Sequence, residues 1–377
     1  MNTCEKIPLS ELMTQHTTVE KISDMKNERY ITLSSNGNGA HERLIKDEKY
    51  PVPFSGYRVS EGQFIYSRID ARNGAYDIIP SELDGFVVSK DFPVFDVDTS
   101  KVLPRFLLRS VLSNGFIEQV KHSSFGATNR MRIKEDVFGS YSIRIPPLDV
   151  QNNIVECLDK AQSIIKYRRE EIVRLDELIK ARFVEMFGKP ELNEFGWTMK
   201  SFGDICTVRQ GLQIPISKRL TEYEENCYEY ITVQYLHGGK AREYIKNPKA
   251  SVICTKDDIL MTRTGNTGMV VTDVAGAFHN NFFLIDFDRN LYTKNFLVHY
   301  LNLDMIQADI IRRAGTSTIP DLNHGEFYKV KIYEPPIDLQ NQFDVFTKHV
   351  DKSKSVVQKS LDEAQLLFDS LMQQYFG

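Results

Sequence analysis

Several features that would point to an enzyme or a secreted protein are missing from this sequence. Its five cysteines are odd in number and show no CxxC spacing, which favours reduced structural thiols over a disulfide framework. Its eight histidines are scattered and form no plausible metal-ligand set. No GxxxxGKS or GxxxxGKT loop is present to hold ATP. These absences argue against a disulfide scaffold, a metal enzyme and an ATP-binding protein.

Long apolar runs and an excess of positive charge are also lacking. No stretch is long and apolar enough to cross a bilayer, and residues 1–21 lack the apolar block of a signal peptide. We therefore expect a cytoplasmic protein with no membrane partner. The net charge of −4 argues against holding nucleic acid by bulk positive charge alone. Any contact with a polyanion must be local, or shared with a partner.

A repeated phrase is the main feature that the sequence does contain. "RIPPLDVQNN" at 144–153 returns as "YEPPIDLQNQ" at 333–342, and residues 126–188 match residues 315–377 without a gap. Farther upstream the two copies drift by a few residues, yet "FDVDTSKVLPRFLL" from position 95 still resembles "IDFDRNLYTKNFLV" from position 285. A length of 377 residues also favours two domains. The chain is therefore read as two copies of one unit.

Each copy begins with short β-rich runs and continues into a long helical pattern. The runs are punctuated by Gly, Asn and Asp, with helical patterns near 104–120 and 294–312. Pro-Pro ends the last strand, and Asp149 and Asp338 stand where a helix N-cap is wanted. We predict an α+β fold: two pseudo-repeated mixed α/β domains separated by a long antiparallel two-helix coiled coil. The predicted segments are 1–148, 149–188, 189–337 and 338–377.

The two long helices carry apolar residues at spacings of three and four, which is typical of a helix that buries one seam. Residues 149–187 would span about 58 Å as a helix, longer than one domain needs. Because a domain's termini commonly lie close together, we expect the helices to pair antiparallel and to hold the two domains apart. The predicted seam consists of Ile154, Cys157, Ala161, Ile164, Ile165, Ile172, Leu175, Leu178 and Ile179 with Phe343, Phe346, Val350, Val357, Leu361, Ala364, Leu367 and Leu371.

Two related surfaces at a fixed separation suit two kinds of target. Duplex DNA has a local dyad, so a pseudo-twofold protein can place the same face of each domain on each of two half-sites. A duplicated scaffold that bridges two protein partners would use the same arrangement. The geometry leaves both readings open.

A family resemblance favours the first reading. A "PPLxxQ" or "PPIxxQ" phrase that opens a long helix ending near Phe-Gly occurs twice, and it follows "DILMTRTGNTG" and a "GTST" or "GATN" stretch. This pattern covers nearly the whole chain and resembles the specificity subunit of a type I DNA restriction-modification system. The resemblance implies that each globular part is a target-recognition domain reading one half of a bipartite, asymmetric DNA site. It also implies that the helices set the gap and dock two methyltransferase subunits.

The resemblance places the chemistry on partner chains. An amino-methyltransferase would carry Asn or Asp before Pro-Pro and an aromatic residue after it, to hold a flipped base. Here Ile145 and Glu334 precede the prolines, and Leu148 and Ile337 follow them. We therefore expect this chain to be non-catalytic and to bind no cofactor. S-adenosylmethionine is expected on the methyltransferase subunits, and ATP with Mg²⁺ on a restriction or translocase subunit where one is present.

Candidate DNA contacts come from loops that match between the copies. Arg or Lys reads guanine, Asn or Gln reads adenine, and hydroxyl and Lys side chains hold phosphates. A solvated or turn role remains the alternative for each residue, and the first copy departs from the second by writing "SRIDARNGA" in place of "TRTGNTG". Gly126, Gly265, Gly268 and Gly315 are predicted turn residues. The candidate contacts are Arg68, Arg72, Asn73, Ser123, Ser124, Thr128, Asn129 and Arg130 in the first copy, and Lys218, Arg219, Arg263, Thr264, Asn266, Arg312, Arg313, Thr316, Ser317 and Thr318 in the second.

Overall fold

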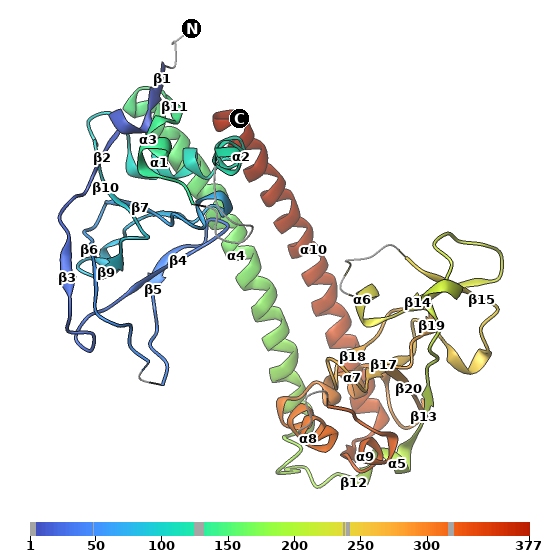
Figure 1. Ribbon diagram of the computed structural model, residues 1–377. Coiled ribbons are helices and arrows are strands. Elements are labelled where there is room, and N and C mark those ends of the chain that lie inside the picture. Colours follow the sequence, from blue (N-terminus) through green and yellow to red (C-terminus); the bar gives the residue numbers. More distant parts are fainter. Residues whose placement is uncertain (1–4, 48, 124–131, 237, 239–241, 316–319) are drawn as a thin grey trace. The chain divides into compact units, whose positions relative to one another are not determined.

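The computed structural model describes residues 5–47, 49–123, 132–236, 238, 242–315 and 320–377. The chain forms two compact units: residues 1–169 with 358–377, and residues 170–357. Each unit contains a mixed α+β globular part and segments of two long helices, α4 (Leu148–Phe187) and α10 (Ile337–Phe376), shown green and red in Figure 1. The predicted fold class, mixed α+β parts with long helices, is confirmed.

The first unit is built on a four-stranded antiparallel sheet in the order β2-β10-β7-β8. Successive residues of β7 point to opposite faces, as in any strand. Phe64 and Tyr66 join the core beneath the helices, and Ile65 joins a separate core on the other face. The elements are β2 (Met13–Gln15), β7 (Phe64–Tyr66), β8 (Tyr76–Ile78), β10 (Val94–Val97), α1 (Pro104–Val111), α2 (Asn114–Ser123) and α3 (Glu135–Ser140).

The second unit repeats this arrangement of a four-stranded sheet beneath helices, which we call the frame. Its sheet has the order β13-β20-β17-β18. The alternation recurs, because Ile259 and Met261 lie in the core beneath the helices and Leu260 lies in the core on the opposite face. The elements are α5 (Phe202–Ile205), β13 (Cys206–Gln210), β17 (Ile259–Thr262), β18 (Val270–Val271), β20 (Phe282–Phe287), α7 (Lys294–Leu301), α8 (Asp304–Ala314) and α9 (His324–Tyr328).

Each unit also has a two-stranded ladder that leads into its long helix. The first unit pairs β1 (Glu5–Pro8) with β11 (Ser142–Ile145), and the second pairs β12 (Thr198–Ser201) with β21 (Lys331–Glu334). Pro-Pro follows β11 and β21 directly, so the ladder stops where the proline nitrogens can no longer donate.

The two units differ in a second set of strands inserted into the frame. The first unit has a sheet in the order β3-β6-β9 and a β4–β5 hairpin, whereas the second has a sheet in the order β15-β14-β19-β16. In the first unit these are β3 (Glu20–Ile22), β4 (Ile31–Ser34), β5 (Gly39–Glu42), β6 (Phe54–Arg58) and β9 (Val87–Ser89). In the second they are β14 (Cys227–Ile231), β15 (Tyr244–Lys246), β16 (Ile253–Cys254), β19 (Gly276–Phe278) and the short helix α6 (Val233–Leu236). Single 3-10 turns are η1 (Leu9–Glu11), η2 (Ala71–Asn73), η3 (Ser81–Leu83), η4 (Ile216–Lys218) and η5 (Ala250–Val252).

A buried glutamine explains why the phrase after Pro-Pro is written twice. In α10, Gln340 is fully buried; its Nε2 donates to the carbonyl oxygens of Leu291 and Pro335, and its Oε1 accepts from the Thr293 amide, all at 2.9 Å. In α4, Gln151 makes the same three kinds of bond, with the Lys101 and Pro146 carbonyls at 3.0 and 2.8 Å and the Leu103 amide at 2.8 Å. The glutamine ties the start of each long helix to the loop before α1 or α7.

The predicted N-caps at Asp149 and Asp338 are wrong by two residues, because the residues that precede the helices are Pro147 and Pro336. Both helices begin earlier, at Leu148 and Ile337, because the Pro147 and Pro336 carbonyls already accept the first helical hydrogen bonds. The two aspartates lie inside the first turn, where a carboxylate is favoured by the helix dipole.

The two long helices pack against each other antiparallel in both units. In the first unit, Leu158 of α4 shares a core with Phe368 and Phe376 of α10. In the second, Phe183 and Phe187 of α4 contact Phe343 of α10, with ring centroids 5.4 and 5.5 Å apart. Most of the predicted seam is buried or half-buried. Ile164, Leu178 and Leu367 are exposed, which corrects their assignment to the seam.

Among the residues that the structure describes, no helix has the length and apolar character needed to span a membrane.

Candidate nucleic-acid interface

Arg68 and Arg263 occupy the same place in the two units. Arg68 lies two residues after β7, and Arg263 directly follows β17. Each of these strands is the third in the order of its four-stranded sheet. The Arg68 carbonyl oxygen accepts a hydrogen bond from the Ile133 amide at 3.1 Å, and the Arg263 carbonyl oxygen accepts one from the Leu322 amide at 2.9 Å. The repeat therefore places a loop with this arginine against the segment that precedes α3 or α9.

Both guanidinium groups are already engaged by carboxylates of the same unit. Arg68 pairs with Glu135, with Nε at 3.0 Å from Oε1. Arg263 pairs with both oxygens of Asp321, at 2.9 and 2.7 Å, and this hydrogen bonding raises the pKa of Arg263. The two arginine side chains are only 26% and 27% exposed. Both arginines thus hold their loop to the segment that precedes α3 or α9, and a base contact by either one stays a prediction.

In the first unit, Arg72 and Asn73 lie on η2, beside a hollow of about 440 Å³. The Asn73 carbonyl oxygen accepts a hydrogen bond from the Asn36 amide at 2.6 Å, so the tip of the β4–β5 hairpin lies on this turn. The Asn73 side chain is exposed, and its Nδ2 donates to Asp70 at 3.3 Å. The hollow gathers cationic and amide side chains suited to phosphates and base edges: Arg72, Arg109, Lys121, Asn36, Asn73, Asn114 and Gln162.

In the second unit, the matching turn spans 263–268. Asn266 is exposed, and its Nδ2 lies 3.4 Å from the Met269 sulfur. Thr264 is half-buried and forms an isolated antiparallel β-bridge with Asp321. Gly265 and Gly268 both have positive φ, 87° and 88°, which confirms them as turn residues. Asn266 is therefore the side chain of this loop that is available to an incoming ligand.

A polar cluster beside Arg263 was missed at the level of sequence. Gln210, at the end of β13, is its centre: Oε1 lies 2.7 Å from Nε2 of His324 and 3.4 Å from a terminal nitrogen of Arg263. Burial lowers the pKa of His324, so this imidazole is neutral at pH 7 and its Nε2–H donates to Gln210. Asn280 donates to Gln213 at 3.4 Å. The phrases "RQGLQ" and "HNN" were the available signals, because adenine is read by amides.

The remaining basic candidates of the second unit divide into engaged and exposed residues. Arg219 donates to the Ile214 carbonyl at 3.0 and 2.9 Å and to Glu243 at 2.8 Å. Arg313 pairs with Asp309 at 2.7 Å. Lys218, in η4, is exposed, and Arg312 is 70% exposed although it also contacts Asp309. Among these four basic residues, Lys218 and Arg312 are therefore the exposed ones.

Several candidates cannot be placed. Ser124, Thr128, Asn129, Arg130, Thr316, Ser317 and Thr318 lie outside the described residues. Ser123 ends α2, and its side chain is likewise outside the description. Among the described residues, no group of three or more His, Cys, Asp and Glu side chains could hold a metal ion.

Comparison with known proteins gives a family match in both units. The model of the type I restriction modification DNA specificity domain matches residues 9–175 and again residues 194–363. The HindI specificity subunit of a type I restriction enzyme from Haemophilus influenzae is 28% identical over 130 residues, which is 34% of this chain and 28% of that protein. The MjaVIII specificity subunit from Methanocaldococcus jannaschii is 20% identical over 181 residues, or 48% of this chain and 42% of that protein. The matched stretches thus span less than half of these relatives.

Two solved structures share the fold over nearly the whole chain. One is a chain from a study of complex assembly and conformational transition in the type I R-M system, with a TM-score of 0.59, 17% identity, and 99% and 97% of the two chains covered. The other is the S subunit of a type I restriction-modification system from M. genitalium, with a TM-score of 0.59, 16% identity, and 100% and 97% covered.

Proposed function

Because this chain belongs to the family of type I restriction modification DNA specificity domains, we propose that it reads a bipartite DNA sequence, one part with each unit. The observation that carries this proposal is the duplicated frame. The same sheet order and the same arginine-supported loop occur in both units. Two copies of one frame suit duplex DNA, whose local dyad offers the same backbone geometry to each of two half-sites.

The differing inserts support an asymmetric site. The first unit adds β3-β6-β9 and a hairpin whose tip lies on η2, while the second adds β15-β14-β19-β16. The loops therefore present different side chains on equivalent frames. We expect the two halves of the recognised sequence to differ for this reason.

The long helices are proposed to set the gap between the half-sites and to dock methyltransferase subunits. Exposed apolar side chains on both helices support a partner surface, since such residues in groups mark interaction sites. In the first unit they are Leu148, Ile164, Tyr167, Leu366 and Leu367; in the second they are Val173, Leu178, Val345 and Val356. S-adenosylmethionine would be bound by the docked subunits, and ATP with Mg²⁺ by a translocase subunit where one joins. This chain would contribute selection and no chemistry.

The negative net charge fits a shared interface. With a net charge of −4, this chain is not expected to neutralise most of the phosphates of a duplex by itself. We propose that the docked subunits supply the remaining cations. The isolated chain should then bind DNA weakly, and its affinity should fall less steeply with salt than that of the assembled complex, because this slope scales with the number of phosphates neutralised.

The direct test is to co-express this chain with its methyltransferase in a host without DNA methylation and to map methyladenine across the genome. We expect a bipartite motif with a fixed gap that disappears when this chain is omitted. If an active methyltransferase gives no motif, or one that is indifferent to this chain, the proposal fails and a scaffold between two protein partners is favoured.

Exchanging the exposed loop amides should alter one half-site at a time. Asn266→Ala is expected to relax base preference by about tenfold at one position of the second unit's half-site, and Asn73→Ala should do so in the first unit's half-site. The measurement is the methylated motif of each variant. Asn290→Ala, a change in an exposed turn amide that bonds Asp288, serves as the control and should leave the motif intact. Both loop changes acting on the same half-site would contradict the assignment.

Shortening α4 and α10 together should change the gap in the motif. One heptad removed from each helix shortens the rise by about 10 Å, which corresponds to about three base pairs of duplex. The half-sites themselves should stay the same. An unchanged gap in a folded, active variant would show that the helices do not set it.

A further inference from the structure

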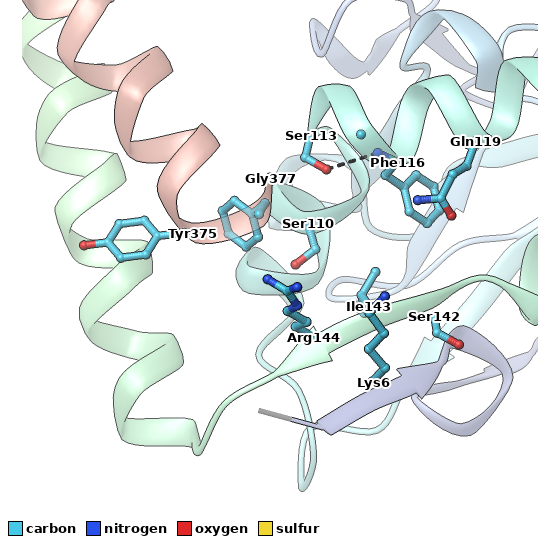
Figure 2. A pocket seen from close by; sticks show the side chains of 12 residues that line it. Lys6, Ser110, Ser113, Phe116, Gln119, Ser142, Ile143, Arg144, Tyr375 and Gly377 are labelled. Carbon is cyan, nitrogen blue, oxygen red and sulfur yellow. Dashed lines mark hydrogen bonds between the residues drawn. The ribbon is translucent and has the colours of Figure 1, made fainter. Parts of the chain in front are cut away.

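A second hollow in the first unit lies away from the loops just described. It measures about 210 Å³ and is formed where the last turn of α10 meets α1, α2 and the β1–β11 ladder (Figure 2). Helix α2 separates the two hollows, because Phe116 and Gln119 line this one, whereas Ile117 and Lys121 line the one beside η2. Its lining also includes Lys6, Arg144, Ser110, Ser113, Tyr375, Phe376 and Gly377.

Two cationic side chains, Lys6 and Arg144, line this hollow. Lys6 and Arg144 are directly opposite each other in the β1–β11 ladder, and both are exposed. Among the described residues, no carboxylate forms an ion pair with either side chain. Figure 2 shows Arg144 reaching from β11 toward Ser110 and the end of α10. Two like charges opposite each other in a ladder are destabilising, so an anionic ligand here would remove a standing repulsion.

The second unit contains the equivalent corner, where the end of a long helix meets the two-stranded ladder, and there a segment of the chain covers it. By the repeat, Tyr333 corresponds to Arg144, Met199 to Lys6, and Phe187–Gly188 to Phe376–Gly377. There, the segment 189–197 lies over the corner. The Tyr333 hydroxyl donates to the Gly188 carbonyl at 3.1 Å, and the Trp197 indole donates to the Phe187 carbonyl at 3.0 Å.

The covering segment is acidic and aromatic. Its sequence is "KPELNEFGW", and the Phe195 and Trp197 rings lie 5.6 Å apart. Burial raises the pKa of Tyr333, and the charge of Glu191 adds to the rise. In the first unit the corresponding tyrosine and methionine are replaced by Arg144 and Lys6. The corner of the first unit therefore carries two charges that complement the carboxylates of such a segment.

We propose that the Lys6–Arg144 hollow binds an extended acidic segment of a partner polypeptide, in the way that the segment 189–197 covers the equivalent corner of the second unit. A carboxylate of the ligand would pair with Arg144 and Lys6, and an aromatic ring would pack beside Phe376. This site is independent of DNA reading, since it lies on the other flank of α2 from the loop amides.

The test uses a fluorescent synthetic peptide with the sequence of residues 189–197 and the full-length chain. Fluorescence polarisation should show saturable binding that becomes at least about tenfold weaker in Arg144→Glu or Lys6→Glu, the change that corresponds to losing one well-formed ion pair. A peptide with glutamine in place of both glutamates should bind correspondingly less. Because both substituted residues are exposed and repel each other, each variant should melt at or above the wild-type temperature, which excludes unfolding as the cause.

Met199→Glu is the matched control, since Met199 occupies the position of Lys6 in the second unit. It should leave peptide binding unchanged, whereas a loss would mean that the peptide displaces the native segment there. Absence of saturable binding, or equal affinity in Arg144→Glu, would overturn the proposal. Displacement of the peptide by a short DNA duplex would also overturn it and would identify the hollow as a phosphate site.

Discussion

Replacing Gln340 with leucine is expected to lower the free energy of unfolding of the second unit by about 3 to 4 kcal/mol. Leucine has a similar volume but cannot replace the amide, which makes three hydrogen bonds at 2.9 Å. The change leaves the buried Pro335 carbonyl without this donor and weakens the attachment of α10 to the loop before α7. Each unpaired buried group costs about 1 to 3 kcal/mol.

The measurement is denaturant unfolding followed by tryptophan fluorescence. Trp197 is the sole tryptophan of the chain and belongs to the second unit, so its signal reports that unit alone. Asn341→Ala is the control, because Asn341 also recurs in the repeat but is exposed; it should cost less than about 0.5 kcal/mol. Gln151→Leu should destabilise the first unit and leave the Trp197 transition in place. A Gln340→Leu midpoint equal to that of Asn341→Ala would refute the role given to the glutamine.

Replacing Gly268 with alanine is expected to destabilise the loop 263–268 and its unit by about 2 to 3 kcal/mol. At φ of 88°, a side chain is strained, and its Cβ would stand 2.9 Å from Gln307 Oε1 and 3.0 Å from Ile310 Cγ2. Gln307 cannot withdraw freely, since its Nε2 donates to the Gly268 carbonyl at 2.9 Å. The loop must therefore lift away from α8 and carry Asn266 with it.

Gly265→Ala separates strain from crowding in the same loop. Gly265 has nearly the same φ, 87°, but a Cβ there would meet no atom within 4 Å. It should cost only about 1 to 2 kcal/mol. Denaturation followed at Trp197 measures both stability losses. If the second unit reads one half-site as proposed, methylation at that half-site should fall further in Gly268→Ala. Equal losses in the two variants would mean that contact with α8 does not position this loop.

The repeated sequence predicted the strands and helices of each frame, because residues that pack into a core recur at the short periods of a strand or a helix. The strand at Ile259–Thr262 and the long helices were visible as apolar periodicity, and Pro-Pro marked the point where each ladder stops. The helix start was displaced because a proline carbonyl can accept the first helical bond, so Asp149 was not needed as a cap. A local pattern could show that Gln340 recurs, but not that it is buried.

The candidate site was less predictable because it depends on pairings distant in sequence. Arg263 meets a carboxylate 58 residues away, and Arg68 meets one 67 residues away. Residue type alone makes both look like guanine readers. The cluster around Gln210 was missed for the same reason, since His324 reaches it from 114 residues along the chain. Asn266 is exposed, whereas the Arg263 side chain is only 27% exposed. This difference depends on the fold and could not be predicted from residue type.

The division of the chain has a consequence for its synthesis. Everything that the second unit needs lies within residues 170–357, whereas the first unit is completed by residues 358–377. During translation the second unit can finish folding first. Until the last turns of α10 emerge, Phe106 lacks the Phe376 ring that lies 5.3 Å from it, and Leu158 lacks Phe368. A nascent chain that has emerged from the ribosome only as far as residue 357 would thus hold one finished unit and one with an open apolar core, the kind of nascent chain that chaperones bind.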